Sequence, residues 1–255
     1  MSMGRKAKIG LVAVVALCAG VSSATAGGEV EIKSNHFKYG GIKYFRAKAE
    51  NVEIGSYGEK KTPIDSGNYI LIQNRITAEN VARAKVRIAT VATIDWAKES
   101  KTDVEANGGL KYFVASASAA VSGSYSKAKS AKLKLVKLIF DLGPLKNTIN
   151  DHASGALNYL RGEGGDGRVV HEVWVVMEAT LANHFDSATS VTVSGSGSGT
   201  VDVKATATAS NNTKKTETIS IKKGTTFAYA MVKVKKWTSG KKRIEKLEDD
   251  LWGIN

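Results

Sequence analysis

Histidine and carboxylate residues are the first candidates for catalysis or metal binding in this chain of 255 residues. The four histidines lie far apart in the sequence, at His36, His152, His171 and His184. They form no HExxH motif or close pair, and the chain also lacks a GxSxG motif and a P-loop. Glu172 and Glu178 would lie about 20 Å apart on one strand, which is too far for an acid–base pair. We therefore expect no enzyme activity, no metal site and no cofactor.

Residues 1–26 have the pattern of a secretory signal peptide. Three basic residues precede the apolar run 9–20, and Ala24-Thr25-Ala26 supplies the small residues of a cleavage site. The run is too short for an ordinary transmembrane helix. We expect cleavage after Ala26 and export to the periplasm or the medium; an uncleaved membrane anchor is the alternative. Cys18, the one cysteine, lies in this leader, so a disulfide framework is excluded.

The charge balance favours an anionic partner. The chain has 37 Lys or Arg against 24 Asp or Glu, a net charge of +13, and loss of the leader would leave 34 basic residues. Hydrophobic residues make up 42%, which suits a folded domain. A membrane surface and nucleic acid both fit this charge. Because an exported protein does not usually meet nucleic acid, we expect an anionic membrane, with no nucleic acid and no small-molecule substrate as partners.

Alternation with a period of two dominates the sequence after residue 80 and predicts β-strands. From Ala82 to Trp96 the even positions are mostly apolar and the basic residues occupy odd positions. The glycine-serine run 195–199 is expected to form a turn between two strands. Further strands are expected over residues 110–122, 131–140, 171–182, 191–193, 201–208, 216–221 and 226–237.

Two helices are expected. Pro144 suits a first helical position, apolar residues recur at helical spacing over 145–160, and the glycine-rich run 162–167 ends that helix. Residues 238–255 are expected to form an amphipathic tail helix that packs on the sheet or contacts a membrane. With the strands, these helices predict a single domain of mixed α+β type over residues 27–237.

Cations and aromatic residues are interleaved between residues 33 and 48. Cations can reach lipid headgroups while rings lie at the membrane interface. The same residues could stack on bases, and a soluble strand pair with a basic face would show the same pattern. The candidate lipid-binding residues are Lys33, Lys38, Tyr39, Lys43, Tyr44, Phe45, Arg46 and Lys48.

Two runs resemble the gasdermin pore-forming domain. In the first, the helical segment 156–161 leads through a glycine loop to the strand 173–178, which reads VWVVME. In the second, residues 219–229 place Lys-Gly-Thr between two strands. The runs occur in the family's order and at a suitable separation. The resemblance implies a twisted antiparallel sheet with surrounding helices.

The resemblance also implies that regions 82–140 and 171–220 refold into membrane-spanning hairpins and that many copies form a ring-shaped pore. Charges keep to odd positions in 82–96 and to even positions in 171–182 and 201–208, so each segment has one uncharged face. A spanning strand needs about 9–11 such residues. The candidate membrane-insertion residues are Val86, Ile88, Ile94, Val114, Leu133, Leu135, Val173, Val175, Met177, Leu181, Val201 and Val203.

Two functions follow from these patterns. The first is an exported, bacterial pore former of the gasdermin type that assembles on anionic membranes, without the C-terminal repressor domain usual in the family. The alternative is a soluble periplasmic or secreted protein of the same fold that binds a polyanion or a protein and forms no pore. A small outer-membrane barrel and an enzyme fit the residues less well.

Overall fold

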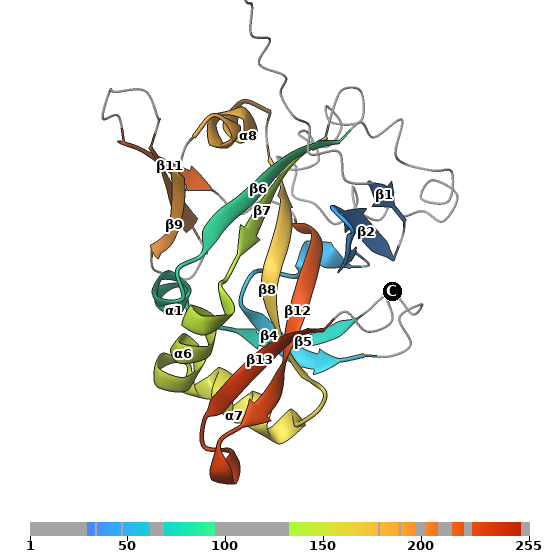
Figure 1. Ribbon diagram of the computed structural model, residues 1–255, viewed down its shortest axis with the longest axis vertical. Coiled ribbons are helices and arrows are strands. Elements are labelled where there is room, and N and C mark those ends of the chain that lie inside the picture. The colour runs from blue at the N-terminus through green and yellow to red at the C-terminus, as the bar shows by residue number, and fades with distance from the viewer. Residues whose placement is uncertain are drawn as a thin grey trace, which may run out of the picture.

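The protein has a mixed α+β fold, dominated by a curled antiparallel sheet with few helices (Figure 1). The computed structural model describes residues 30–33, 35–46, 48–61, 69–94, 133–177, 179–188, 190–196, 202–208, 216–221 and 226–250. The helices of this part are η1 (Ala49–Asn51), α1 (Ala78–Arg83), α6 (Leu142–His152), α7 (Ser154–Glu163), α8 (Ala179–Asp186) and η3 (Ser239–Lys241). The strands are β1 (Glu31–Ile32), β2 (His36–Tyr39), β3 (Ile42–Phe45), β4 (Ser56–Lys60), β5 (Ile70–Arg75), β6 (Arg87–Ile94), β7 (Leu133–Ile139), β8 (Gly167–Val176), β9 (Ser190–Ser196), β10 (Asp202–Thr208), β11 (Thr216–Ile221), β12 (Thr226–Trp237) and β13 (Ile244–Asp250).

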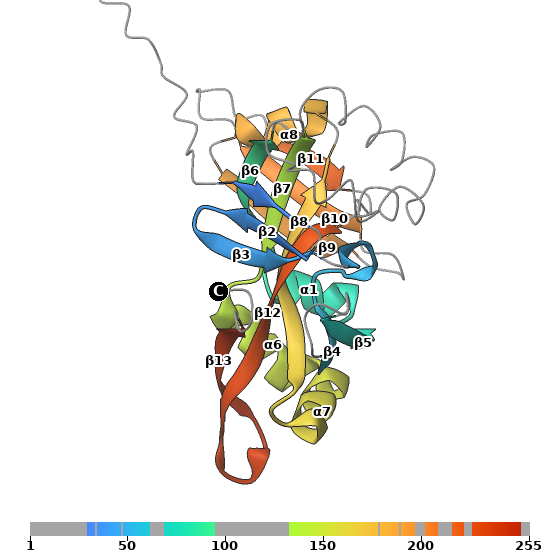
Figure 2. The ribbon, with the colours of Figure 1, turned by 90° about the vertical axis from the view of Figure 1, so that its right-hand side faces the viewer.

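Strands β8 and β12 form a central antiparallel ribbon that carries the rest of the main sheet. In its upper half, β7 and then β6 flank β8, while β3, β2 and β1 extend from β12. In its lower half, β4 and β5 flank β8, and β13 flanks β12 (Figures 1 and 2). The halves meet at a β-bulge, since Ala230 faces Glu172 whereas Met231 faces Val170, leaving His171 as an extra residue.

Both faces of the upper half are covered, which explains the nearly continuous burial of β8. One face packs against helices and the small sheet, with Val173 and Val175 in that core. The other face packs against β1–β3, and there Trp174 is fully buried. The rings of Phe37 and Tyr44 meet Trp174 edge-on, with centroids 5.4 and 5.7 Å away. A strand buried on both faces loses the alternation of polar and apolar residues.

The expected helix over 144–160 is two helices. Helix α6 ends at His152, and α7 begins at Ser154; between them lies Ala153, whose backbone (φ −118°, ψ 61°) is not helical. The side-chain amide of Asn80 donates a 3.0 Å hydrogen bond to the carbonyl of His152, one of the carbonyls left open at the helix end. As predicted, α7 ends in the glycine loop, with Gly164 at φ 60°.

Strands β9, β10 and β11 form a separate three-stranded antiparallel sheet beside β6 and α1 (Figure 1). The backbone N–H of Val193 donates a 3.1 Å hydrogen bond to the carbonyl of Val86, just before β6. The predicted strands over 191–193, 201–208 and 216–221 therefore exist, and β9 and β10 pair across the glycine-serine run. Their sheet is distinct from the main one.

The tail is a strand, so the expected amphipathic helix over 238–255 is wrong for its described part. Residues 244–250 form β13, which hydrogen-bonds to the long edge of β12. The buried residues Ile244, Leu247 and Asp250 recur every third position, which mimics a helix. This spacing accompanies register shifts between Val234, Lys236 and Trp237 in the strand pair.

Two predicted strands have wrong limits. The strand expected over 82–96 begins only at Arg87, because α1 precedes it and is capped by the Thr77 side chain. The strand expected over 171–182 ends at Val176, and Leu181 lies on α8. The predictions over 131–140 and 226–237 are confirmed as β7 and β12. The expected strand 110–122 lies outside the described residues.

Substitution of Asn150 tests how the tail strand is held. Its side chain accepts a 2.8 Å hydrogen bond from the N–H of Ile244 and donates a 2.9 Å bond to the carbonyl of the same residue. We expect Asn150→Ala to lower the free energy of unfolding by about 1–3 kcal/mol, because two backbone groups lose their partner. Urea denaturation measures this change.

The matched control is Asn147→Ala, an exposed position on the same helix. Both substitutions change helix propensity equally, so the control should not lose stability. Equal effects of the two variants would contradict the proposed anchoring of β13.

Candidate functional site

The basic and aromatic residues between 33 and 48 do not form one exposed surface. Phe45 is 1% exposed and its ring lies 4.8 Å from that of Tyr69. Tyr44 is equally buried, against Trp174. Arg46 lies beneath the surface, 4.7 Å from the Phe227 ring. These three side chains cover the sheet and are not exposed in this structure.

The lysines of this segment do reach solvent. Lys38 and Lys43 are cross-strand neighbours on the face opposite Tyr44, both partly exposed. Lys33 pairs with Glu31 at 2.8 Å, and Lys48 is exposed. Tyr39 is partly buried, with its ring centroid 4.9 Å from that of Trp174. The segment thus presents cations without the accompanying rings that the sequence suggested.

The candidate insertion residues are divided between two cores. Ile94, Leu133 and Leu135 are buried in the core under β1–β3. The core on the other face holds Val86, Val173, Val175 and Met177, with Ile88 and Leu181 packed against it. In this structure the described candidates therefore pack into cores on both sides of the sheet. Val114 and Val201 lie outside the described residues, and Val203 lies on β10 opposite Gly195 and Ile221.

Strands β9 and β10 form an amphipathic hairpin. Val193 faces Ala205 across the pair, and both are buried against the helices and β6. On the opposite face, Thr192 faces Thr206, and Ser194 faces the exposed Lys204. Here the alternation read from the sequence does define one apolar and one polar face.

A cluster of polar groups lies between β7, β8 and β3. The ammonium group of Lys137 lies 3.4 Å from the Glu172 carboxylate and 3.3 Å from the Tyr44 hydroxyl. It also stands 5.7 Å from the ring centroids of Tyr44 and Trp174. Burial, assisted by the charge of Glu172, raises the pKa of Tyr44 above its ordinary value. Lys137 lies on the same strand face as Leu133 and Leu135. A lysine in an otherwise apolar row is the feature of the sequence that could have predicted this cluster.

A buried ion network links β4, β8 and β13. Asp250 accepts a 2.6 Å hydrogen bond from Arg168 and lies 2.9 Å from the Lys60 ammonium group. Arg168 also donates to the carbonyls of Gly165 and Gly167. Burial would raise the pKa of Asp250, but the bonds from Arg168 and Lys60 prevail and hold it below its ordinary value. This network fixes strands together and offers no group for chemistry.

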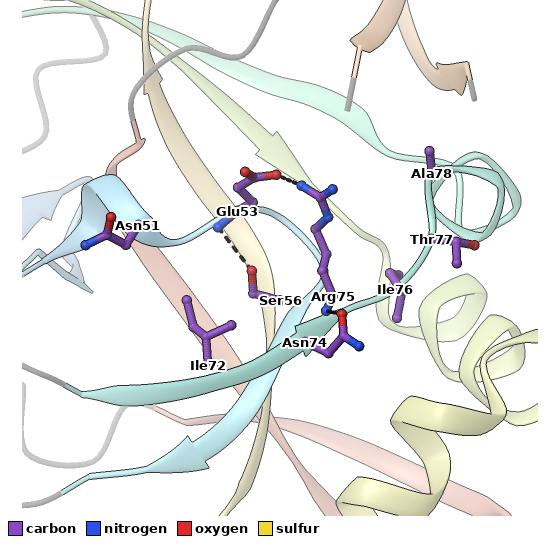
Figure 3. A pocket seen from close by; sticks show the side chains of 9 residues that line it. All are labelled: Asn51, Glu53, Ser56, Ile72, Asn74, Arg75, Ile76, Thr77 and Ala78. Carbon is purple, nitrogen blue, oxygen red and sulfur yellow. Dashed lines mark hydrogen bonds and ion pairs between the residues drawn. The ribbon is translucent and has the colours of Figure 1, made fainter. Parts of the chain in front are cut away.

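A pocket of about 490 Å³ lies beside β5 (Figure 3). An ion pair between Glu53 and Arg75 crosses it, and the Ser56 hydroxyl accepts a hydrogen bond from the Glu53 N–H. The described residues that line it include no histidine or cysteine. The lining residues are Asn51, Glu53, Ser56, Ile72, Asn74, Arg75, Ile76, Thr77 and Ala78.

The part of the chain that the structure describes contains no group of three His, Cys, Asp or Glu residues able to hold a metal ion. Within the same ranges, no helix has the length and apolar character needed to cross a membrane. Comparisons with models of protein families, with curated proteins and with solved structures gave no match.

The buried His171 makes stability depend on pH. Burial lowers its pKa to about 4, although Asp249, with a carboxylate oxygen 3.3 Å away, acts in the opposite direction. The unfolded chain binds a proton near pH 6.5, so stability falls as the pH drops from about 6.5 towards 4. We expect this residue alone to remove about 2 kcal/mol of unfolding free energy between pH 7 and pH 5.

Urea denaturation of wild type and His171→Leu at pH 7 and pH 5 measures the contribution of His171 to the pH dependence of the unfolding free energy. The variant should lose about 2 kcal/mol less than wild type on acidification. The exposed His152 provides a matched control, since His152→Leu should keep the wild-type difference. Equal pH dependence in wild type and His171→Leu would contradict the assignment.

Proposed function

We propose that this chain is an exported protein with a gasdermin-like fold that binds anionic membranes and assembles into a β-barrel pore. The observation that carries this proposal is the amphipathic hairpin β9–β10. Its buried face is made of valine and alanine and its exposed face of hydroxyl groups and Lys204. A strand pair of this kind can turn one face to lipid and the other to a water-filled lumen.

The length of this hairpin supports the proposal. Strands β9 and β10 have seven residues each, a little fewer than the roughly 9–11 that span a bilayer, and the five residues 197–201 that join them could lengthen both strands in the pore. Because β9–β11 form their own sheet, they can leave β6 and α1 without breaking a ladder of the main sheet. In the pore, hydrogen bonds to neighbouring hairpins would satisfy the strand edges.

The pair β6–β7 supports a second inserting segment. The two strands are antiparallel neighbours, with Ile94 opposite Leu133, and residues 95–132 connect them. Of these, residues 106–126 carry a single charged side chain, Lys111. A long, nearly uncharged connection between adjacent strands suits a hairpin that extends into a bilayer.

The alternative function, a soluble protein that binds a polyanion or a protein without forming a pore, is favoured by a different observation. Ile94, Leu133 and Leu135 are almost fully buried between β6–β7 and β1–β3. Insertion of β6–β7 must take these side chains out of a closed core. A protein that never leaves its soluble state needs the same core and no such step.

Dye release from liposomes tests the proposed function directly. Purified residues 27–255 should release dye from vesicles that contain anionic lipid and form ring-shaped assemblies on them. Binding without release, weakening steeply with salt, would support the alternative. If the protein causes no dye release and forms no rings over a range of pH and salt, pore formation is contradicted.

A disulfide between the small sheet and the main sheet tests the role of β9–β10. Val86 and Val193 are joined by a backbone hydrogen bond and buried in the same core, which suits the Cα separation of a disulfide, about 4.4–6.8 Å. Oxidised Val86→Cys/Val193→Cys protein should bind vesicles but release no dye, and reduction should restore release. The two single variants are controls that must leak in both conditions. Undiminished leakage by the oxidised protein would contradict a movement of this hairpin.

A further inference from the structure

The hairpin β12–β13 ends in a concentration of positive charge. Residues 233–246, named the basic tip here, contain seven Lys or Arg and one Glu, a net charge of +6 against +13 for the whole chain. The tip projects from the lower end of the molecule, while β9–β11 lie at the upper end (Figures 1 and 2). About half of the protein's net charge is therefore presented on one protruding turn.

Only some of these cations have carboxylate partners. Lys236 pairs with Glu245 at 2.6 Å, Arg243 pairs with Asp151, and two further lysines share Glu248. The three remaining lysines are exposed, and their ammonium groups make no hydrogen bond or ion pair with the described residues. They are Lys241, Lys242 and Lys246.

The turn is held in place by its own hydrogen bonds and by α7. Thr238 donates its N–H to the carbonyl of Arg243 and accepts the N–H of Arg243 on its hydroxyl, at 2.9 and 3.0 Å. The guanidinium group of Arg161 donates to the carbonyls of Lys241 and Lys242, at 2.7 and 3.3 Å. Arg161 thus orders the turn and adds another positive charge to it.

The like charges of the basic tip lie close together, and this arrangement does not stabilise the fold. Lys236 faces Lys246 directly across the two strands, an arrangement that is unfavourable in an isolated sheet. The consecutive cations Lys241, Lys242 and Arg243 follow within the same turn. An anionic surface outside the protein would offset this repulsion.

We propose that the basic tip is the surface by which the protein docks on anionic lipid headgroups, an inference that rests on the proposed action at membranes. Trp237 is the one aromatic residue of the tip, and it is partly buried against the core. The tip therefore offers cations without a free ring for stacking on bases, which favours a lipid surface over single-stranded nucleic acid. Each lysine near such a surface strengthens binding about fivefold.

The position of the tip separates docking from insertion. Because the tip and β9–β11 lie at opposite ends of the molecule, a docked protein keeps its insertion hairpin away from the headgroups (Figure 1). Docking then requires no change in the fold, whereas pore formation does.

Vesicle flotation of the purified protein tests the docking surface. The tip variant is Lys241→Gln/Lys242→Gln/Lys246→Gln, and the matched control is Lys38→Gln/Lys43→Gln/Lys48→Gln, with the same change of charge on β2, β3 and the turn that follows. On vesicles of phosphatidylcholine with phosphatidylserine, the tip variant should bind about 100-fold more weakly than wild type, and the control within a few-fold of it. Wild-type binding should weaken with salt and vanish on phosphatidylcholine alone. Unchanged unfolding midpoints confirm that both variants are folded.

Three outcomes would overturn the inference. In the first, the tip variant binds like wild type or the control loses more affinity; if wild type still binds and releases dye, the proposed function stands and only the tip assignment fails. In the second, wild type binds no anionic vesicle, and both proposals fail. In the third, a single-stranded DNA oligomer binds the tip more tightly than vesicles do at the same salt, which would reassign the surface to nucleic acid.

Discussion

The pairing of β8 with β12 is the interaction on which the rest of the structure depends. Each strand of this ribbon has a second edge, and each edge is shared by two different partners, one in the upper half and one in the lower half. The two strands thereby hold four neighbours: β7 and β4 pair with β8, and β3 and β13 pair with β12. The bulge at His171 marks the point at which the partners change, so one irregular residue separates two sheets built on the same ribbon.

Because the ribbon is covered on both faces, its polar residues need partners inside the protein. Arg168, His171 and Glu172 lie within one largely buried strand, and each needs a partner of opposite charge or a hydrogen-bonding group. The partners come from flanking strands: Asp250 and Asp249 from β13, and Lys137 from β7. The buried charges therefore select which strands can occupy the edges, in addition to the apolar packing.

The sequence pattern predicted elements better than it predicted their surroundings. Alternation located β7, β9, β10 and most of β6, because each of those strands contains a run in which polar and apolar residues alternate. It could not show that β1–β3 would cover the second face of the sheet, because that contact joins segments far apart in the sequence. As a result Tyr44, expected at the surface, is buried in the core. The strand β13 mimicked a helix for a different reason: register shifts in its pairing with β12 accompany burial at every third position. The lysine and arginine content of the basic tip can be read from the sequence, but its exposure follows from the β12–β13 hairpin that carries it.

The order of the strands along the chain has a consequence for when this protein can fold. The central strand β8 is complete at Val176, yet its partner β12 begins only at Thr226, and β3 near the other end of the sequence must also wait for it. A chain that emerges from its N-terminus first therefore lacks the axis of its main sheet until its last thirty or so residues have appeared. Until then β1–β3 remain without the strand from which they extend, so the main sheet is completed only when β12 has formed.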